Sequence, residues 1–221
     1  MRTRFDSELD TLYVSMIKMG SLSETTLSEV GDALKSDDES RLGNIVDISH
    51  SIDEKEREIK ALCMKLLLRH QPVAKDLRTI SSAMKMITDM ERIGDNAADI
   101  AEIIPFLHSR DIAERISLPE MANAVIEMVH SAIDAFVRSD EAKAEATMKM
   151  DDIVDDFFTK AKIAITDLIR EGSAEAPEAP DLLMIAKYLE RMGDHAASLA
   201  RWVAWSLNAN GDWLNNPIKA E

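Results

Sequence analysis

The sequence predicts an all-α protein built as two tandem three-helix bundles that are related by an internal pseudo-repeat. The first reason is composition, because 221 residues contain only seven Gly, six Pro and 5% aromatic residues. The second is a pentapeptide at 91–95 (Glu-Arg-Ile-Gly-Asp) that returns 99 positions later at 190–194 (Glu-Arg-Met-Gly-Asp). The third is that apolar residues around both copies recur every three or four positions, as in amphipathic helices. A duplicated helical unit therefore organises the chain.

The first half is expected to form three helices. A long helix over 3–34 precedes a second helix over about 38–70, and both have apolar residues at helical spacing. Gln71 and Pro72 end the second helix, because proline disfavours helix in the residue before it and suits the first turn of a new one. The third helix, over about 73–107, carries the first pentapeptide.

The second half is expected to repeat this arrangement. A polar connector at 108–118 leads into a fourth helix over 118–138. The fifth helix should span 140–171, and a Pro- and Ala-containing linker follows at 172–180. The sixth helix, over 181–208, carries the second pentapeptide.

These elements divide the chain into two expected domains, 1–110 and 111–221. Short loops make the helices of each trio antiparallel neighbours. The tail at 208–221 is expected to be loop. Cys63 is the only cysteine, so the chain has no internal disulfide, and its leucine neighbours indicate a small buried hydrophobe.

Each pentapeptide places two carboxylates on one face of its helix. Glu91 and Asp95, like Glu190 and Asp194, are spaced i, i+4 and lie beside the apolar seam rather than in it. Like charges at this spacing repel, and Gly inside a helix costs roughly 1 kcal/mol relative to Ala. Because both costs recur in both copies, a hard cation held by the carboxylates is expected to offset them. The alternative is a solvated acidic face with a Gly that eases helix packing.

The second helix of each bundle supplies further acids, since 52–53 aligns with 154–155 at an offset of 102. Asp151 and Asp155 form another i, i+4 pair, whereas Ser49 stands where the second half has Asp151. The better-furnished site is therefore expected from Glu190, Asp194, Asp151 and Asp155. The weaker site is expected from Glu91, Asp95, Asp99 and Asp53, with Asp47 and His50 as substitutes. His195, which follows the second pentapeptide, is a further candidate ligand or an ordinary solvated residue.

Composition restricts the class of partner. The chain has 41 acidic and 26 basic residues, for a net charge of −15. This balance argues against nucleic acid and anionic membrane surfaces, which attract basic proteins. No apolar run approaches the length of a membrane span, and no signal-peptide core follows the N-terminus. A cytoplasmic protein without membrane insertion is expected.

Three ordered motifs carry a family resemblance: 71–78 (Gln-Pro-Val-Ala-Lys-Asp-Leu-Arg), 91–95, and 187–196 (Lys-Tyr-Leu-Glu-Arg-Met-Gly-Asp-His-Ala). Over nearly its whole length the chain resembles the PhoU family of bacterial phosphate-signalling regulators. The resemblance implies two three-helix bundles in tandem. It also implies metal binding through acid-xxx-Asp motifs, with iron, zinc, manganese or magnesium as the expected ions. Ser49 and Ser198 depart from the acids of the other half and leave the composition of both sites open.

The resemblance further implies a regulatory protein that is not an enzyme. PhoU proteins restrain phosphate-starvation signalling and phosphate uptake when phosphate is plentiful. The expected partners are the ATPase of the phosphate ABC transporter and a membrane sensor histidine kinase. A homodimer is also expected, because Met-rich apolar positions on the first and fourth helices could support one.

Other classes remain open on the residues alone. A di-iron oxidase site would project its acids into a helical core, whereas the motif acids here lie off the seam. A two-metal phosphohydrolase is possible in principle, but no nucleophile or phosphate-binding Gly loop is apparent. A metal-free structural adaptor is the third alternative. Lys75 and Arg78 could hold phosphate, although ordinary ion pairs explain them as well.

Overall fold

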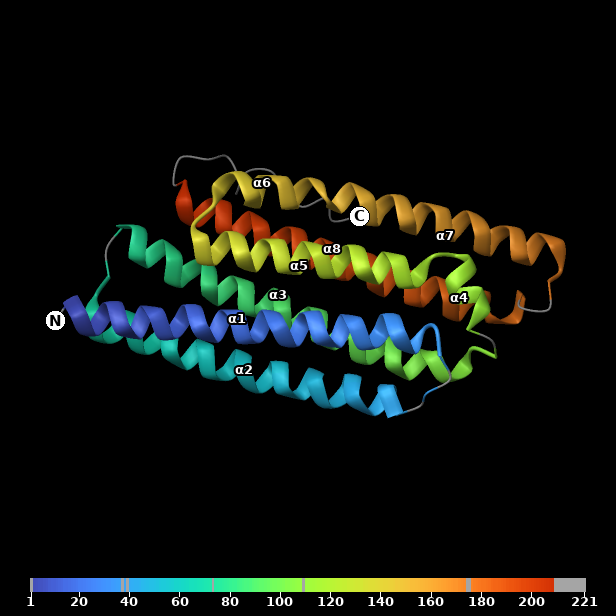
Figure 1. Cartoon of the computed structure of the whole chain (residues 1–221), viewed down its shortest axis with the longest axis horizontal. Coiled ribbons are helices and arrows are strands. Elements are labelled where there is room, and N and C mark those ends of the chain that lie inside the picture. Colours follow the sequence, from blue (N-terminus) through green and yellow to red (C-terminus); the bar gives the residue numbers. More distant parts are fainter. Residues whose placement is uncertain are drawn as a thin grey trace.

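The computed structural model describes residues 2–36, 38, 40–72, 74–108, 110–173 and 176–208. Throughout these residues the regular secondary structure is helical (Figure 1). The first half consists of α1 (Arg2–Ala33), α2 (Ser40–His70), α3 (Ala74–Ile103) and the short 3-10 turn η1 (Ile104–Phe106). The second half consists of α4 (Asp111–Arg115), α5 (Leu118–Arg138), α6 (Glu141–Lys149), α7 (Asp151–Glu171), η2 (Ala176–Glu178) and α8 (Ala179–Leu207). The all-α prediction is confirmed.

The two helical groups lie side by side, with α3 against α8 and α1 against α5 (Figure 1). Arg78 donates from Nε to the Ser206 carbonyl at 3.3 Å, and Ser82 donates from Oγ to the Trp202 carbonyl at 2.9 Å. The partner's number falls as the donor's number rises, so α3 and α8 run antiparallel. The predicted pair of tandem bundles is thus present, and one long helix from each forms much of the contact between them.

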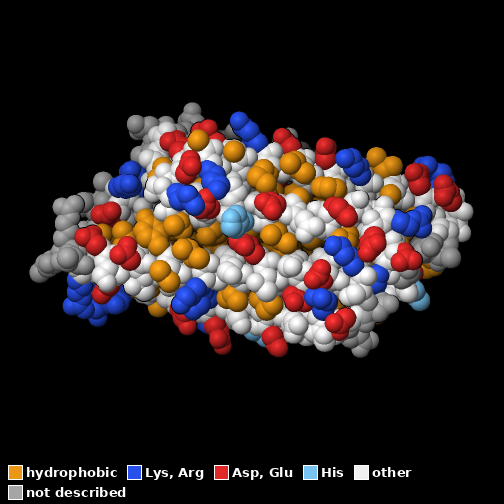
Figure 2. Space-filling model, in the orientation of Figure 1, with side chains coloured by type: hydrophobic (Ala, Val, Ile, Leu, Met, Phe, Trp, Pro, Cys, Tyr) orange, Lys and Arg blue, Asp and Glu red, His pale blue; other side chains and the backbone are white. Residues whose placement is uncertain are grey.

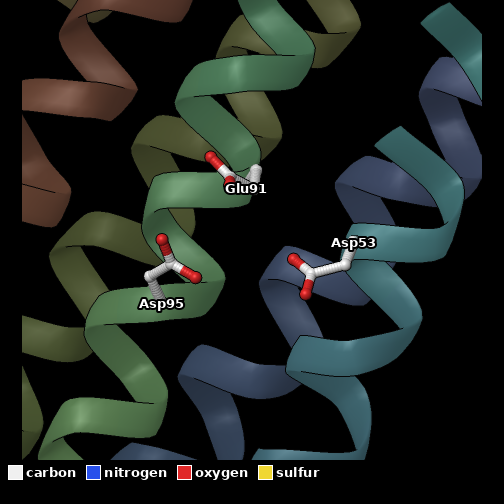
Figure 3. A group of neighbouring side chains, drawn as sticks. All are labelled: Asp53, Glu91 and Asp95. Atoms are coloured by element: carbon white, nitrogen blue, oxygen red, sulfur yellow. The ribbon is translucent and has the colours of Figure 1, made fainter. Parts of the chain in front are cut away.

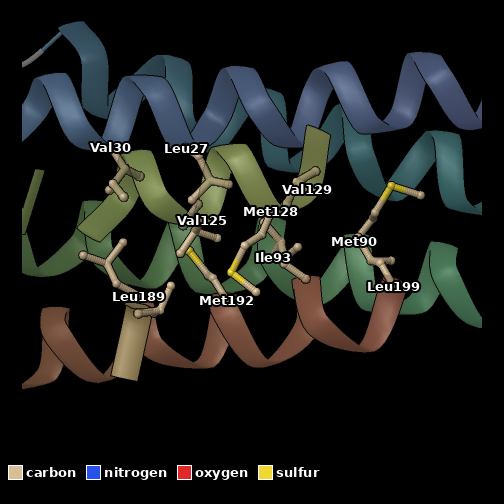
Figure 4. Close-up of a cluster of buried hydrophobic side chains, with 14 of the residues drawn as sticks. Leu27, Val30, Met90, Ile93, Val125, Met128, Val129, Leu189, Met192 and Leu199 are labelled. Carbon is tan, nitrogen blue, oxygen red and sulfur yellow. The ribbon is translucent and has the colours of Figure 1, made fainter. Parts of the chain in front are cut away.

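The apolar side chains of both halves join in one continuous core, which Figure 4 shows between α1, α3, α5 and α8. Its labelled members are Leu27, Val30, Met90, Ile93, Val125, Met128, Val129, Leu189, Met192 and Leu199. Because the core crosses from one half to the other, each bundle helps to bury apolar side chains of the other bundle. The domain boundary at residue 110 stays a prediction.

Several element boundaries differ from the expected ones. The fifth helix is interrupted at Met150, whose N–H donates to the Thr147 carbonyl at 3.0 Å, in the i to i−3 pattern of a tighter turn. The third helix ends at Ile103 rather than near 107, since Pro105 disfavours helix before it and η1 follows. The connector contains α4, whose Ile112 and Ala113 are buried. Beyond Asn208 the expected tail lies outside the described residues.

Candidate metal centres

The first carboxylate group joins α2 to α3. Asp53 on α2 and Glu91 and Asp95 on α3 each offer an oxygen atom, and these atoms all lie within 4.8 Å of one another. Figure 3 shows Glu91 and Asp95 on adjacent turns of α3, with Asp53 on the neighbouring α2. All three side chains are half-buried. Arg92 lies at the edge of the group, with Nη1 3.0 Å from Asp95 Oδ2 and Nε 3.5 Å from Glu91 Oε2.

Crowding makes this group unfavourable when fully charged. Burial raises the pKa of Glu91, and the neighbouring Asp95, Asp53 and Glu56 raise it further, while Arg92 opposes them. Carboxylate oxygens from two helices are the ligands that hard cations prefer. The donor set of the first group therefore fits a metal ion.

The glycine of the first pentapeptide permits this approach of the helices. A Cβ atom on Gly94 would lie 3.1 Å from Ile52 Cδ1 and 3.5 Å from Ser49 Oγ, both on α2. Glycine is a poor helix former, but at position 94 of α3 the absence of a side chain leaves room for α2 to pack closely. The same close packing brings Asp53 toward the α3 acids.

The second pentapeptide repeats the contact on α7 and α8. A Cβ atom on Gly193 would lie 2.9 Å from Val154 Cγ1 and 3.5 Å from Asp151 Oδ1. Val154 and Asp151 correspond to the residues that face the first glycine at the offset of 102. The duplication inferred from sequence is therefore also a duplication of helix packing, and the acid at position 151 lies where Ser49 lies in the first half.

The second carboxylate group contains all four acids expected of it. The pKa of Asp151 is raised to about 6, by burial first and then by the charges of Asp194, Asp155 and Glu190, while Arg201 opposes the shift. The pKa of Asp194 is also raised, by burial first and then by Glu190. In the second group, unlike the first, no three acids among the described residues have ligand atoms that all lie within 4.8 Å of one another. That this site is the better furnished stays a prediction.

The remaining candidate ligands lie elsewhere. Asp47 and His50 are exposed on α2 and are not members of the first group. His195 turns toward α3, where its Nδ1 lies 3.0 Å from Asp89 Oδ1, and Ser198 donates to Asp89 Oδ2 at 2.9 Å. His195 therefore takes part in a contact between the two halves.

Asp99 takes part in the counterpart of that contact. Tyr188 interacts with Asp99 across α3 and α8, and burial together with this carboxylate raises the pKa of the tyrosine. The pairs Asp89–Ser198 and Asp99–Tyr188 exchange under the 99-residue offset, because 89 + 99 = 188 and 198 − 99 = 99. An approximate two-fold axis between α3 and α8 thus relates the halves. The offset alone could have paired these positions, but it could not show that they touch.

Other candidate residues have structural roles. Arg78 donates to the Ser206 carbonyl, which explains its position without a phosphate. Cys63 is buried, and burial raises the pKa of its thiol to about 12. Glu127 and His130 have the Glu-x-x-His spacing of di-iron proteins, but both are exposed, and His130 Nδ1 lies 3.2 Å from Glu24 Oε1. No inward-facing di-iron arrangement results from this pair.

The raised pKa of Asp151 predicts a pH dependence of stability. Its ordinary value is 3.8 and its folded value about 6, so the folded protein retains a proton that the unfolded chain loses in this window. Stability therefore falls as pH rises through the window. Asp151→Asn is expected to stabilise the metal-free protein by on the order of 1–2 kcal/mol near neutral pH, after allowance for solvent screening, and to have little effect below about pH 4. Thermal melts in chelator across pH test this, and a gain that is independent of pH would contradict it.

Among the described residues, no helix combines the length and apolar character needed to cross a membrane.

Comparison with known proteins identifies the family. The PhoU domain model matches twice, at 16–104 and 118–203, one copy in each half. A phosphate-specific transport system accessory protein PhoU homolog of Clostridium acetobutylicum is 33% identical over 97% of this chain and 99% of its own. PhoU homolog 1 of Thermotoga maritima is 32% identical over 91% of this chain and 88% of its own.

Two solved structures agree with this result. The crystal structure of PhoU from Pseudomonas aeruginosa has a TM-score of 0.83 at 28% identity, covering 93% of this chain and 100% of its own. The phosphate transport system regulatory protein PhoU from Streptococcus pneumoniae has a TM-score of 0.85 at 28% identity, covering 93% of this chain and 98% of its own. The repeated motif, the two bundles and these similarities lead to one conclusion: the chain belongs to the PhoU family.

Proposed function

We propose that this protein is an accessory of phosphate transport that restrains phosphate uptake and phosphate-starvation signalling when phosphate is plentiful. The observation that carries the proposal is the double PhoU match, at 16–104 and 118–203, together with relatives named as accessory proteins of phosphate-specific transport. The family is one of accessory and regulatory proteins rather than of enzymes. The protein accordingly acts by contact with partners and not by catalysis.

The proposed partners are the ATPase of the phosphate ABC transporter and a sensor histidine kinase, which the protein links in the cytoplasm. Its net charge of −15 favours basic protein surfaces over nucleic acid. The acids of both carboxylate groups are half-buried or exposed between helix pairs, where a bound metal and a partner could meet the same surface. Pull-down from cells against the transporter and the kinase tests the two contacts separately.

A homodimer is part of the proposal, but not through the methionines that suggested it. Met16 and Met19 on α1, and Met121 and Met128 on α5, are fully buried within the chain. The exposed apolar residues on these two helices are Val14, Ile17 and Val137. Figure 2 shows hydrophobic side chains gathered over the N-terminal half of α1 beside the end of α5. Light scattering of the purified protein measures the oligomeric state.

We further propose that both carboxylate groups bind metal, with iron, zinc, manganese or magnesium as candidates. In the first group Asp53, Glu91 and Asp95 would hold the ion, and it would link α2 to α3. In the second group the ligands would come from α7 and α8. The support is the chemistry of the donors and the raised pKa values of Glu91, Asp151 and Asp194, since a cation relieves the repulsion.

The alternative is a metal-free adaptor. Its support is that basic side chains already lie against both groups: Arg92 beside Asp95, and Lys187 beside Glu190. Elemental analysis of protein purified without affinity metals separates the two proposals. A carboxylate-bridged metalloenzyme has the least support, because the acids of both groups are half-buried or exposed and do not project into the helical core.

Deletion of the gene tests the regulatory proposal. Cells without the protein are expected to express phosphate-starvation genes even in high phosphate, because the restraint on the kinase is lost. A starvation-promoter reporter and uptake of labelled phosphate measure the effect, and a plasmid copy of the wild-type gene is the control. Reporter activity that stays low in high phosphate after deletion would count against the proposal.

A further inference from the structure

We infer that Lys187 is a built-in counter-cation of the second carboxylate group and makes the two groups unequal in their need for metal. The metal part of this inference rests on the proposed function. Lys187 Nζ lies 2.6 Å from Glu190 Oε2, one turn along α8. The lysine side chain is 39% exposed and the glutamate side chain 15%, so the pair is partly withdrawn from water. Partial withdrawal strengthens the attraction relative to a fully solvated pair.

A ring on the facing helix helps to hold the lysine. Lys187 Nζ lies 5.3 Å from the centre of the Phe158 ring on α7, within the range of cation–π attraction. Lys162, also on α7, lies 5.0 Å from the centre of the same ring. Lys187 is therefore placed between an aromatic ring and a carboxylate of the group, and Glu190 already has a cation partner before any metal binds.

The first group has different residues at the equivalent positions. Position 187 − 99 = 88 is Thr88, whose hydroxyl donates to the Met84 carbonyl of its own helix at 3.4 Å. Position 158 − 102 = 56 is Glu56, which raises the pKa of Glu91. The first half thus has an acid where the second has a ring, and a hydroxyl where the second has an ammonium group.

The arginine of the pentapeptide does not remove this difference. Arg92 and Arg191 occur at equivalent positions, so both halves have one. Arg92 contacts Asp95 through side chains that are 57% and 42% exposed, a more solvated pair than Lys187 with Glu190. Despite Arg92, the three acids of the first group keep their oxygens within 4.8 Å of one another.

Two consequences follow for metal binding. An ion entering the second group must displace Lys187 to use the Glu190 oxygen that it contacts, which lowers the affinity of that group. In the first group the competitor on the same helix is Arg92, whose contact with Asp95 is more exposed to solvent and therefore weaker, so this group takes up metal at the lower concentration. Without metal, the second group depends on Lys187 for part of its stability.

An exchange of the two equivalent residues tests the inference, with Lys187→Thr and Thr88→Lys as the variants. Lys162→Thr is the matched control, because it removes an ammonium group from the same ring, and Lys162 makes no ion pair among the described residues. In chelator, K187T is expected to melt about 1–3 °C below wild type, with a difference that shrinks at high salt. K162T should melt closer to wild type. Equal melting of K187T and K162T in chelator would overturn the role of Lys187.

Titration with Mn²⁺ alone, followed by calorimetry, tests the metal part. Wild type should show a tighter and a weaker class of site. K187T should tighten the weaker class by about tenfold, and T88K should weaken the tighter class by a similar factor. Unchanged Mn²⁺ affinity in both variants would overturn the unequal loading. Failure of every protein, including wild type, to bind Mn²⁺ would refute the unequal loading together with the proposed metal function, while the melts in chelator would still decide whether Lys187 neutralises the group.

Discussion

Replacing Ile93 by Ala is expected to lower the free energy of unfolding by about 2–5 kcal/mol. The side chain is fully buried on α3 and belongs to the core that α3 shares with α8 (Figure 4). Its counterpart at the 99-residue offset is Met192, which is fully buried as well. Truncation there leaves a cavity between the halves, which neither half can close alone.

Urea denaturation followed by circular dichroism measures this effect. We expect a single unfolding transition whose midpoint shifts to a lower urea concentration, because the core is continuous. Leu68→Ala is the control: this leucine is 76% exposed on α2, and its truncation should change stability by less than about 0.5 kcal/mol. Two transitions, of which only one responds to Ile93→Ala, would contradict the shared core and support a domain boundary near residue 110.

Much of this fold follows from local periodicity. The spacing of Ile52, Ile59 and Leu66 predicts the buried face of α2, and all three are buried. The repeated pentapeptide predicts two equivalent helices, and α3 and α8 pack through a two-fold contact. Periodicity does not predict the interruption at Met150, because the apolar spacing continues across it and the break is confined to two i to i−3 hydrogen bonds, donated by the N–H groups of Met150 and Ile153.

The candidate sites are predictable in part for the same reason. The i, i+4 spacing places Glu91 and Asp95 on one face of their helix. The 102-residue offset, which aligns Asp53 with Asp155, adds Asp53 to the same group, and the structure places it beside them. Asp99 and His195 are assigned differently by the structure, since their positions depend on the contact between α3 and α8. A sequence repeat reveals which helices are alike, but not which of them touch. The i, i+3 spacing of Lys187 and Glu190 allows an ion pair, but it does not predict that Lys187 also lies against the Phe158 ring of α7.

Removing the carboxylates of the first group is expected to abolish its metal binding. In Glu91→Gln with Asp95→Asn, two of the three converging acids lose their charge, which should weaken binding at this group by at least about a hundredfold. Without metal, the same variant should be as stable as wild type or more so, because the repulsion that raises the pKa of Glu91 is relieved.

Glu190→Gln with Asp194→Asn is the matched variant of the second group. Elemental analysis and thermal melts of both variants, with and without chelator, measure the contribution of each group. The sequence favours the second group as the better furnished, since it has Asp151 where the first has Ser49. The closer convergence of oxygens in the first group and the lysine in the second favour the opposite order. If the first variant loses more metal than the second, convergence and internal neutralisation outweigh the number of acids; if both retain the wild-type metal content, neither group is a metal site.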